Sequence, residues 1–244
     1  MMFAARARVD KRFLPTAQSL GACGNSRGPL LSRFDQPVER AVPQEIEFLY
    51  DFGSPNAYLV EMVLPEIAKR HGLTIRHTPI LLGGLFKITG NLPPMVRFHE
   101  VPSKINYMRI EMDRFIKRHD IAFQWNPKFP ILTTALMRGA IYAQGKPWET
   151  DYRAAVYRHC WVLGTDMNDP DTILNVLRAD GLPAAEILGA TQDPKIKAAL
   201  FTATQTAMDR HVFGIPTMFF EGQMYFGKDS LIDLEHALAQ KTPG

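Results

Sequence analysis

Residues 51–65 read DFGSPNAYLVEMVLP, and this stretch decides the fold. Residues 45–52 (EIEFLYDF), which overlap its start, alternate apolar with polar or charged side chains, which is the pattern of a β-strand. Within the stretch, apolar residues from Leu59 to Ile67 recur at the spacing of a helix, which Pro65 is expected to kink or interrupt. The sequence therefore predicts a strand that runs directly into a helix, with a serine at the junction.

The remaining strands place this unit in a larger fold. Residues 73–80 (LTIRHTPI) read as a second strand, so the chain opens β-α-β and the two strands are expected to be parallel. Residues 217–227 (TMFFEGQMYFG) read as a hairpin with Glu221-Gly222 at its turn, and a last helix starts near Asp229. Between these parts, the chain from 81 to about 210 has mostly helical periodicity.

Two helix boundaries in this block carry local signals. Asp169 is expected to cap one helix, and Pro147 to lie in the first turn of an earlier one. In chain order the elements are β-α-β, a helical block, then α-β-β-α, which is the order of a thioredoxin-like α/β fold with an insertion after the second strand. We expect residues 45–81 and 205–244 to form the thioredoxin-like domain and residues 82–204 an inserted helical subdomain.

Composition limits the function classes. The chain of 244 residues is 46% hydrophobic and 22% charged, which is ordinary for a globular protein. No apolar run approaches the ~18 residues that cross a membrane, so no membrane association is expected. The net charge of +3 comes from residues 1–44, where seven basic side chains outnumber three acidic ones. The rest has no basic excess, so we expect no nucleic-acid partner.

The first 44 residues lack any periodicity and hold Arg, Gly, Pro and Ser. Three interpretations are open: a disordered extension, an organelle transit peptide, or upstream sequence from a misassigned start. We favour a disordered or misassigned extension.

Cysteine use and the absence of known motifs exclude further classes. Cys23 and Cys160 form no disulfide framework, which indicates a reducing compartment, so we expect a cytoplasmic protein. Cys160 lies on a helical pattern and is interpreted as a buried core thiol. The sequence contains no GxGxxG, GxxxxGK[ST], GxSxG or HExxH motif, so neither a dinucleotide site nor a metal site is expected.

One residue at the strand–helix junction indicates chemistry. Ser54 lies where a thioredoxin fold places the first cysteine of its CxxC motif, and positions 54–57 read SPNA. Without a thiol this site cannot exchange disulfides. A hydroxyl at a helix N-terminus can still donate a hydrogen bond to an anion, such as the thiolate of a bound ligand. By itself, however, Ser54 is better explained as a helix cap.

Pro216 shifts the balance towards function. The motif VFGIPTMFF puts Ile215-Pro216 directly before a strand, where a cis peptide bond is permitted. In thioredoxin-like folds such a proline is cis and faces the tip of the first helix, and the backbone before it pairs with a peptide-like ligand. An ordinary trans proline is the alternative.

The motifs of this chain resemble those of one family. DFGSPNAYL, FKITGN, VPSKINYM, AFQWNPKFP, RHVFGIPTMFF and YFGKDSL occur in the order of the 2-hydroxychromene-2-carboxylate isomerase and kappa-class glutathione transferase family, a DsbA-like branch of the thioredoxin fold. They cover about residues 45–240. The resemblance implies glutathione as cofactor, a small electrophilic substrate, a place in aromatic catabolism and a homodimer.

Carried over motif by motif, the resemblance also implies a site. Ser54 would hold and activate the glutathione sulfur, and the backbone of Ile215, before Pro216, would pair with the cysteinyl part. The γ-glutamyl end would lie on four residues at the start of the last helix, Gly227, Lys228, Asp229 and Ser230. The positions that face substrate or glutathione in the family correspond to Lys87, Asn91 and Lys104, with Phe129 as an aromatic substrate contact.

Two positions depart from the family pattern. Asn56 stands where an aromatic residue is usual, and Lys228 where a small or amide side chain is usual. These changes bear on substrate choice and leave the residues implied for glutathione in place.

The leading hypothesis is a glutathione-dependent isomerase acting on 2-hydroxychromene-2-carboxylate or a related unsaturated keto acid. The glutathione thiolate, held by Ser54, would add to the substrate and leave after a bond has rotated, while Lys87 fixes the carboxylate. The alternative is a kappa-type transferase that releases the conjugate. A DsbA-like oxidoreductase is disfavoured because there is no CxxC, and a non-enzymatic binding module is the remaining option.

Overall fold

The computed structural model describes residues 45–240, so the predicted character of residues 1–44, Cys23 included, lies outside the described part. The elements follow one another along the chain as β1 (Glu45–Tyr50), α1 (Pro55–Arg70), β2 (Thr74–Pro79), α2 (Leu82–Thr89), α3 (Pro94–Arg97), α4 (Pro102–Arg118), α5 (Thr134–Ala143), α6 (Glu149–Trp161), α7 (Pro170–Ala179), α8 (Ala184–Ala190), α9 (Pro194–Asp209), β3 (Thr217–Phe220), β4 (Gln223–Phe226), the 3₁₀ turn η1 (Lys228–Ser230) and α10 (Leu231–Ala239). The thioredoxin-like order with helices inserted after the second strand is therefore confirmed.

The strands form one mixed sheet in the order β2-β1-β3-β4. β1 and β2 are parallel, with Ile46 opposite Ile75, and β1 and β3 are antiparallel, with Phe48 opposite Met218. Because β1 is a central strand, it is buried on both faces from Ile46 to its end, including the polar side chain of Glu47. The expected β-α-β unit and C-terminal hairpin are confirmed, and the hairpin turns at Glu221, which has a φ of 47°.

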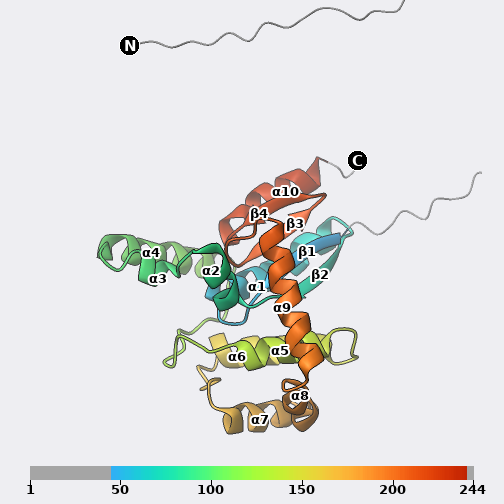
Figure 1. The fold of residues 1–244 in the computed structure, drawn as a ribbon. Helices are drawn as coiled ribbons and strands as arrows, with labels where there is room; N and C mark the ends of the chain where they lie inside the picture. Colours follow the sequence, from blue (N-terminus) through green and yellow to red (C-terminus); the bar gives the residue numbers. More distant parts are fainter. Residues whose placement is uncertain (1–44, 241–244) are drawn as a thin grey trace, which may run out of the picture. The chain divides into compact units, whose positions relative to one another are not determined.

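The helices divide between the sheet and the insertion. α1 packs against α10 and α6, whereas α9 packs against β2 and extends to α5. Figure 1 shows α5 to α8 gathered beyond one end of the sheet and α2 to α4 to its side. The sheet end from which β1 leads into α1 is thus bordered by inserted helices.

The interruption expected at Pro65 and the place expected for Pro147 are wrong. α1 continues through Pro65 to Arg70 without interruption. Pro65 is on the exposed side of the helix, so the carbonyl that loses its donor can be hydrated, while Leu64 and Ile67 stay buried in the core. Pro147 lies outside α6, whose N-cap is Trp148. The cap at Asp169 is confirmed, since its side chain accepts a hydrogen bond from the N–H of Thr172.

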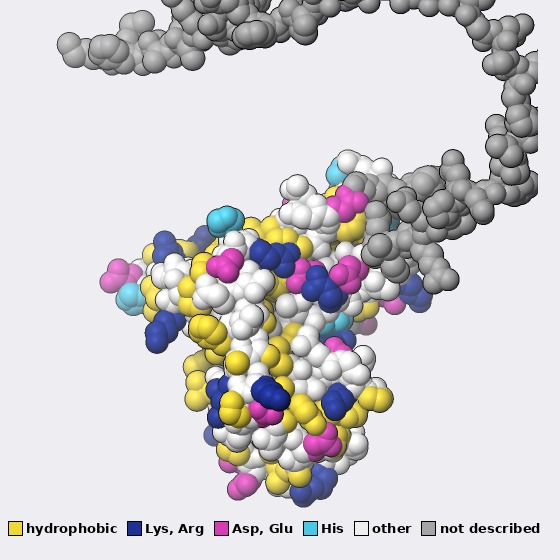
Figure 2. Space-filling view, turned by 45° about the vertical axis from the view of Figure 1, so that its right-hand side comes forward, with side chains coloured by type: hydrophobic (Ala, Val, Ile, Leu, Met, Phe, Trp, Pro, Cys, Tyr) yellow, Lys and Arg dark blue, Asp and Glu magenta, His cyan; other side chains and the backbone are white. Residues whose placement is uncertain are grey.

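The surface of the described part is mixed in character. On the face shown in Figure 2, basic and acidic side chains are interspersed with hydrophobic ones. Exposed apolar side chains gather on the segment from α2 to α4: Ile88, Leu92, Met95, Val96, Val101, Tyr107 and Ile110. Within residues 45–240 no helix combines the length and apolar character needed to cross a bilayer.

Candidate active site

The junction between β1 and α1 forms a tight turn that ends in Ser54. The N–H of Ser54 donates to the carbonyl of Asp51 at 3.0 Å, and Pro55 then occupies the first turn of α1. The backbone of Ser54 is extended, and its Oγ accepts a hydrogen bond from the N–H of Ala57 at 3.2 Å. The side chain is therefore a helix N-cap, fixed at the positive end of the helix dipole. Only 5% of Ser54 is exposed.

The segment before β3 lies directly against this serine. The Ile215–Pro216 peptide bond is cis, and the Oγ of Ser54 donates to the carbonyl of Ile215 at 3.2 Å, across 161 positions of sequence. The carbonyl of Pro216 accepts from the N–H of Gly227 at 2.9 Å. The structure thus brings together the three segments that the sequence assigned to one ligand.

The GKDS segment, residues 227–230, carries an ion pair between neighbours. The Nζ of Lys228 lies 2.7 Å from both carboxylate oxygens of Asp229 and 5.4 Å from the centre of the Phe115 ring. The Lys228 side chain is 5% exposed, whereas that of Asp229 is 61% exposed. Ser230 donates from its Oγ to the carbonyl of Gly227 at 2.9 Å and stabilises the turn. The pair presents an accessible carboxylate beside a buried cation.

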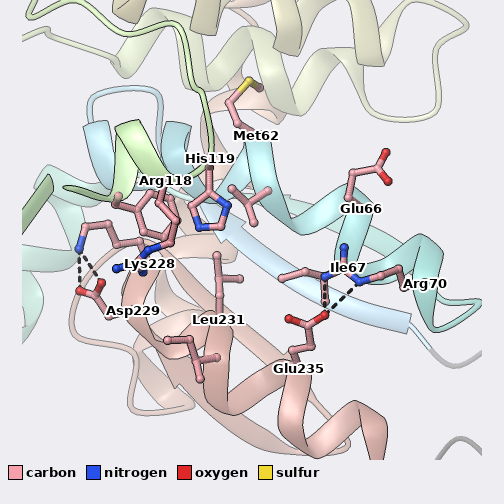
Figure 3. Close-up of a pocket in the computed structure, with 13 residues that line it drawn as sticks. Met62, Glu66, Ile67, Arg70, Arg118, His119, Lys228, Asp229, Leu231 and Glu235 are labelled. Carbon is pink, nitrogen blue, oxygen red and sulfur yellow. Dashed lines mark hydrogen bonds and ion pairs between the residues drawn. The ribbon is translucent and has the colours of Figure 1, made fainter. Parts of the chain in front are cut away.

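A cavity of about 280 Å³ adjoins this pair, between α1, the end of α4 and α10. Figure 3 shows ion pairs at its opposite ends, Lys228 with Asp229 and Arg70 with Glu235. His119 lies between them, and burial together with the charge of its neighbour in α4 lowers the pKa of its ring. Ser54 does not line this cavity, which meets the site only at Lys228 and Asp229.

Two of the predicted substrate contacts lie on α2 and the loop that follows it. Asn91 donates from Nδ2 to the carbonyl of Phe213 at 2.8 Å, two residues before Ile215. This bond ties the end of α2 to the segment that contains the cis proline. Lys87 occupies the last turn of α2 and is exposed. The position of Lys87 is therefore set by a helix whose end is attached to the candidate site.

The other two predicted contacts lie in different surroundings. Phe129 is 40% exposed, and its ring lies 6.0 Å from that of Trp161, whose indole N–H donates to the carbonyl of Phe52 at 2.8 Å. Phe129 thus extends an aromatic cluster that reaches the serine turn. Lys104 is in the first turn of α4, and its Nζ lies over the ring of Phe98, 5.2 Å from the ring centre. Lys104 thus lies at the start of α4, whereas the buried residues of this helix, Met112 and Phe115, lie in its second half.

Asp51, which lies three residues before Ser54 and is 1% exposed, carries no motif that predicts a site residue. Its carboxylate accepts hydrogen bonds from the N–H of Gly53 at 2.9 Å and the N–H of Leu82 at 2.7 Å. Burial raises the pKa of this carboxyl, while these two bonds and the nearby Thr133 side chain act to lower it. An acidic residue directly after the strand that leads to Ser54 was the available signal.

A buried ionic group fixes the position of α1 in the fold. Glu61 of α1 accepts from the Nε of Arg153 at 2.8 Å and lies 3.1 Å from the Nε2 of His77. Burial acts to raise the pKa of Glu61, but its bonds to His77 and Arg153 outweigh this and hold the pKa below its ordinary value. α1 is thereby joined to β2 and α6. Residues 45–240 contain no cluster of three side chains that could hold a metal ion.

Comparisons with known proteins agree with this geometry. A family model described as a DSBA-like thioredoxin domain matches residues 45–239. A 2-hydroxychromene-2-carboxylate isomerase of Sphingobium xenophagum is 30% identical over 193 residues, which is 79% of this chain and 97% of that protein. The human glutathione S-transferase kappa 1 is 26% identical over 219 residues, 83% of this chain and 94% of the relative.

Solved structures give the same result. The structure of a 2-hydroxychromene-2-carboxylate isomerase superimposes with a TM-score of 0.70 at 26% identity and covers 80% of this chain and 95% of its own. A probable DsbA oxidoreductase from Streptomyces coelicolor superimposes with a TM-score of 0.64 at 15% identity, covering 82% of this chain and 92% of its own, a likeness of fold alone.

Proposed function

Because the chain belongs to the DsbA-like thioredoxin domain family, in the branch of the 2-hydroxychromene-2-carboxylate isomerases and kappa-class glutathione transferases, we propose that it is a glutathione-dependent isomerase. Its proposed substrate is 2-hydroxychromene-2-carboxylate or a related unsaturated keto acid. The observation that supports this most is the contact between the hydroxyl of Ser54 and the carbonyl of Ile215, at a helix tip without cysteine.

The residues of the site fit glutathione chemically. The carboxylate of Asp229 is exposed enough to accept a ligand ammonium, and Lys228 beside it attracts a carboxylate, so the pair complements the α-amino acid end of the tripeptide. The N-terminal N–H groups and dipole of α1 favour negative charge beside Ser54. When bound, glutathione would supply a nucleophilic sulfur that attacks the substrate and is released again.

The side chains of the chain have separate roles in this proposal. Ser54 donates its hydroxyl hydrogen to the sulfur, and a charge-assisted bond of about 1.5–3 kcal/mol lowers a thiol pKa by about one to two units. Lys87 binds the carboxylate of the substrate and stabilises negative charge that develops on the adjacent oxygen. Phe129, at the edge of the aromatic cluster, contacts the ring of the substrate.

The decisive assay supplies 2-hydroxychromene-2-carboxylate with and without a small amount of reduced glutathione. We expect isomerisation that requires glutathione and consumes none of it, and that falls at least tenfold in Ser54→Ala. Turnover at an unchanged rate without glutathione would contradict the proposal, as would an unchanged rate in the variant.

A kappa-type transferase is the second candidate, since three relatives named glutathione S-transferase kappa 1 match the chain at 23% to 26% identity. Chlorodinitrobenzene separates the two functions, because a transferase consumes glutathione as it forms a conjugate. Conjugation without isomerisation would favour the transferase. A DsbA-like oxidoreductase remains disfavoured, and no reduction of insulin disulfides is expected because position 54 has no thiol.

We also propose a homodimer, which the family resemblance implies. Sedimentation equilibrium of the full chain tests this proposal, and a monomer at enzyme concentrations well above those of the assay would contradict it.

A further inference from the structure

The first turn of α2 lacks a cap of its own. The residue at its N-cap position, Leu81, makes no side-chain capping bond, yet the N–H of Leu82 is one of the groups that a helix leaves unsatisfied. That N–H donates to the Oδ2 of Asp51 at 2.7 Å, although the two residues are 31 positions apart. Asp51 therefore caps α2 from a different element of the fold.

The same carboxylate also fixes the serine turn. Its Oδ1 accepts from the N–H of Gly53 at 2.9 Å, while its backbone carbonyl accepts from the N–H of Ser54 at 3.0 Å. Both bonds close the turn whose last residue is Ser54. Since Asp51 is 1% exposed, no water competes freely for these donors.

A third segment meets Asp51 at the start of α5. Thr133 is the N-cap residue of α5, and its side chain is near enough to the Asp51 carboxylate to act on its pKa. The turn packs closely on this segment, because a methyl group added at Gly53 would lie 3.2 Å from the Cγ2 of Thr133 and 3.5 Å from the carbonyl oxygen of Ile131. The segment directly follows Phe129 and Pro130.

From these contacts we propose that Asp51 is a positioning residue, whose buried carboxylate fixes the serine turn, the start of α2 and the start of α5 relative to one another. The proposal rests on the proposed function, because it explains how Ser54, Lys87 and Phe129, carried by these three segments, come to face one substrate. Asp51 itself does not contact the reacting atoms. It acts through the segments that it joins.

Asp51→Asn is the direct test, because the amide keeps the shape but cannot accept from every donor. We expect kcat/KM for the keto acid to fall about tenfold or more in the wild-type background, the effect of one lost hydrogen bond. In the Ser54→Ala background the same change should cost less, since the part of its effect that acts through Ser54 is already absent. Equal losses in both backgrounds would overturn the proposal.

Hydrogen exchange tests the proposal without a measurement of activity. In Asp51→Asn, hydrogen exchange at the amides of Gly53 and Leu82 should accelerate more than in Asp169→Asn, a matched change at the N-cap of α7. Unchanged protection at Gly53 and Leu82 would overturn the proposal even if the proposed function failed. Thr133→Val, which removes the hydroxyl and keeps the shape, should give a smaller loss of kcat/KM in the same direction.

The thiolate absorbance of bound glutathione separates geometry from charge. If Asp51 acts by position, less thiolate should form in Asp51→Asn than in the wild type at the same pH. More thiolate would mean that the buried negative charge dominates at Ser54, and the proposal would be wrong. Absence of glutathione binding to the wild type would instead contradict the proposed function and leave the exchange measurement as the test of Asp51.

Discussion

Replacing Ser54 by alanine should raise the pKa of the glutathione thiol bound to the protein. The hydroxyl is buried, donates to the carbonyl of Ile215 and accepts from the N–H of Ala57, so its position is fixed. A hydrogen bond to a charged acceptor contributes about 1.5–3 kcal/mol, and each pKa unit corresponds to about 1.36 kcal/mol. The expected rise is therefore about one to two units.

The measurement is a pH titration of the ultraviolet absorbance of the thiolate at saturating glutathione. With the wild type, the midpoint should lie about one to two units below the ordinary thiol value of about 8.5, and with Ser54→Ala close to it. Ser54→Thr keeps the hydroxyl and should retain most of the shift. The rate at a pH below both midpoints should fall by about 10- to 100-fold in the alanine variant, in proportion to the lost thiolate.

The variant also loses a helix cap, and this loss needs a control. Removal of an N-cap side chain costs about 1 kcal/mol, which lowers the Tm of a domain of this size by about 2–4 °C. Asp169→Ala removes a comparable cap from α7 and should lower the Tm without moving the thiol midpoint. If Ser54→Ala left the midpoint within a few tenths of a unit of the wild type, the hydroxyl would not be the group that stabilises the sulfur.

Further predictions concern the substrate, the core and the thiol. In steady-state kinetics, Lys87→Gln should raise KM for the keto acid about tenfold and leave the Kd for glutathione unchanged. Lys69→Gln, at the far end of α1, is the control and should not raise KM. The folded-state pKa of Glu61 is lowered below its ordinary value of 4.5, so its contribution to stability is present above that pH and is lost as the pH falls through the folded-state pKa. The free energy of unfolding of Glu61→Gln, measured in urea, should therefore fall less at acid pH than that of the wild type. Cys160 is fully buried and burial raises its pKa, so a disulfide reagent should label it only after denaturation, as measured in Cys23→Ser; rapid labelling of the native variant would contradict this.

The fold was predictable because its signals are local. The strand before Ser54, the helix after it and the turn at Glu221 each follow from the residues within a few positions. The exception at Pro65 is not local: Pro65 stays in α1 because the apolar side of that helix is buried in the core, a tertiary contact that outweighs the propensity of one residue.

The candidate site was predictable only in part. Ser54 and Pro216 stand out in the sequence, and the structure brings them together. By contrast, the bond from Asn91 to Phe213 depends on how the inserted helices are placed, and no pattern within a short window specifies this. Asp51 was missed for the same reason, since its partner Leu82 is 31 positions away.

A serine hydroxyl has a single hydrogen, and in this structure that hydrogen is directed at the carbonyl of Ile215. A thiolate that accepts this hydrogen bond therefore leaves the carbonyl oxygen of Ile215 without a donor. A peptide-like ligand carries amide N–H groups that can occupy it, whereas a simple thiolate cannot. The site would then discriminate between a tripeptide thiol and a small thiol when the hydrogen bond of Ser54 changes its acceptor from the carbonyl oxygen to the sulfur.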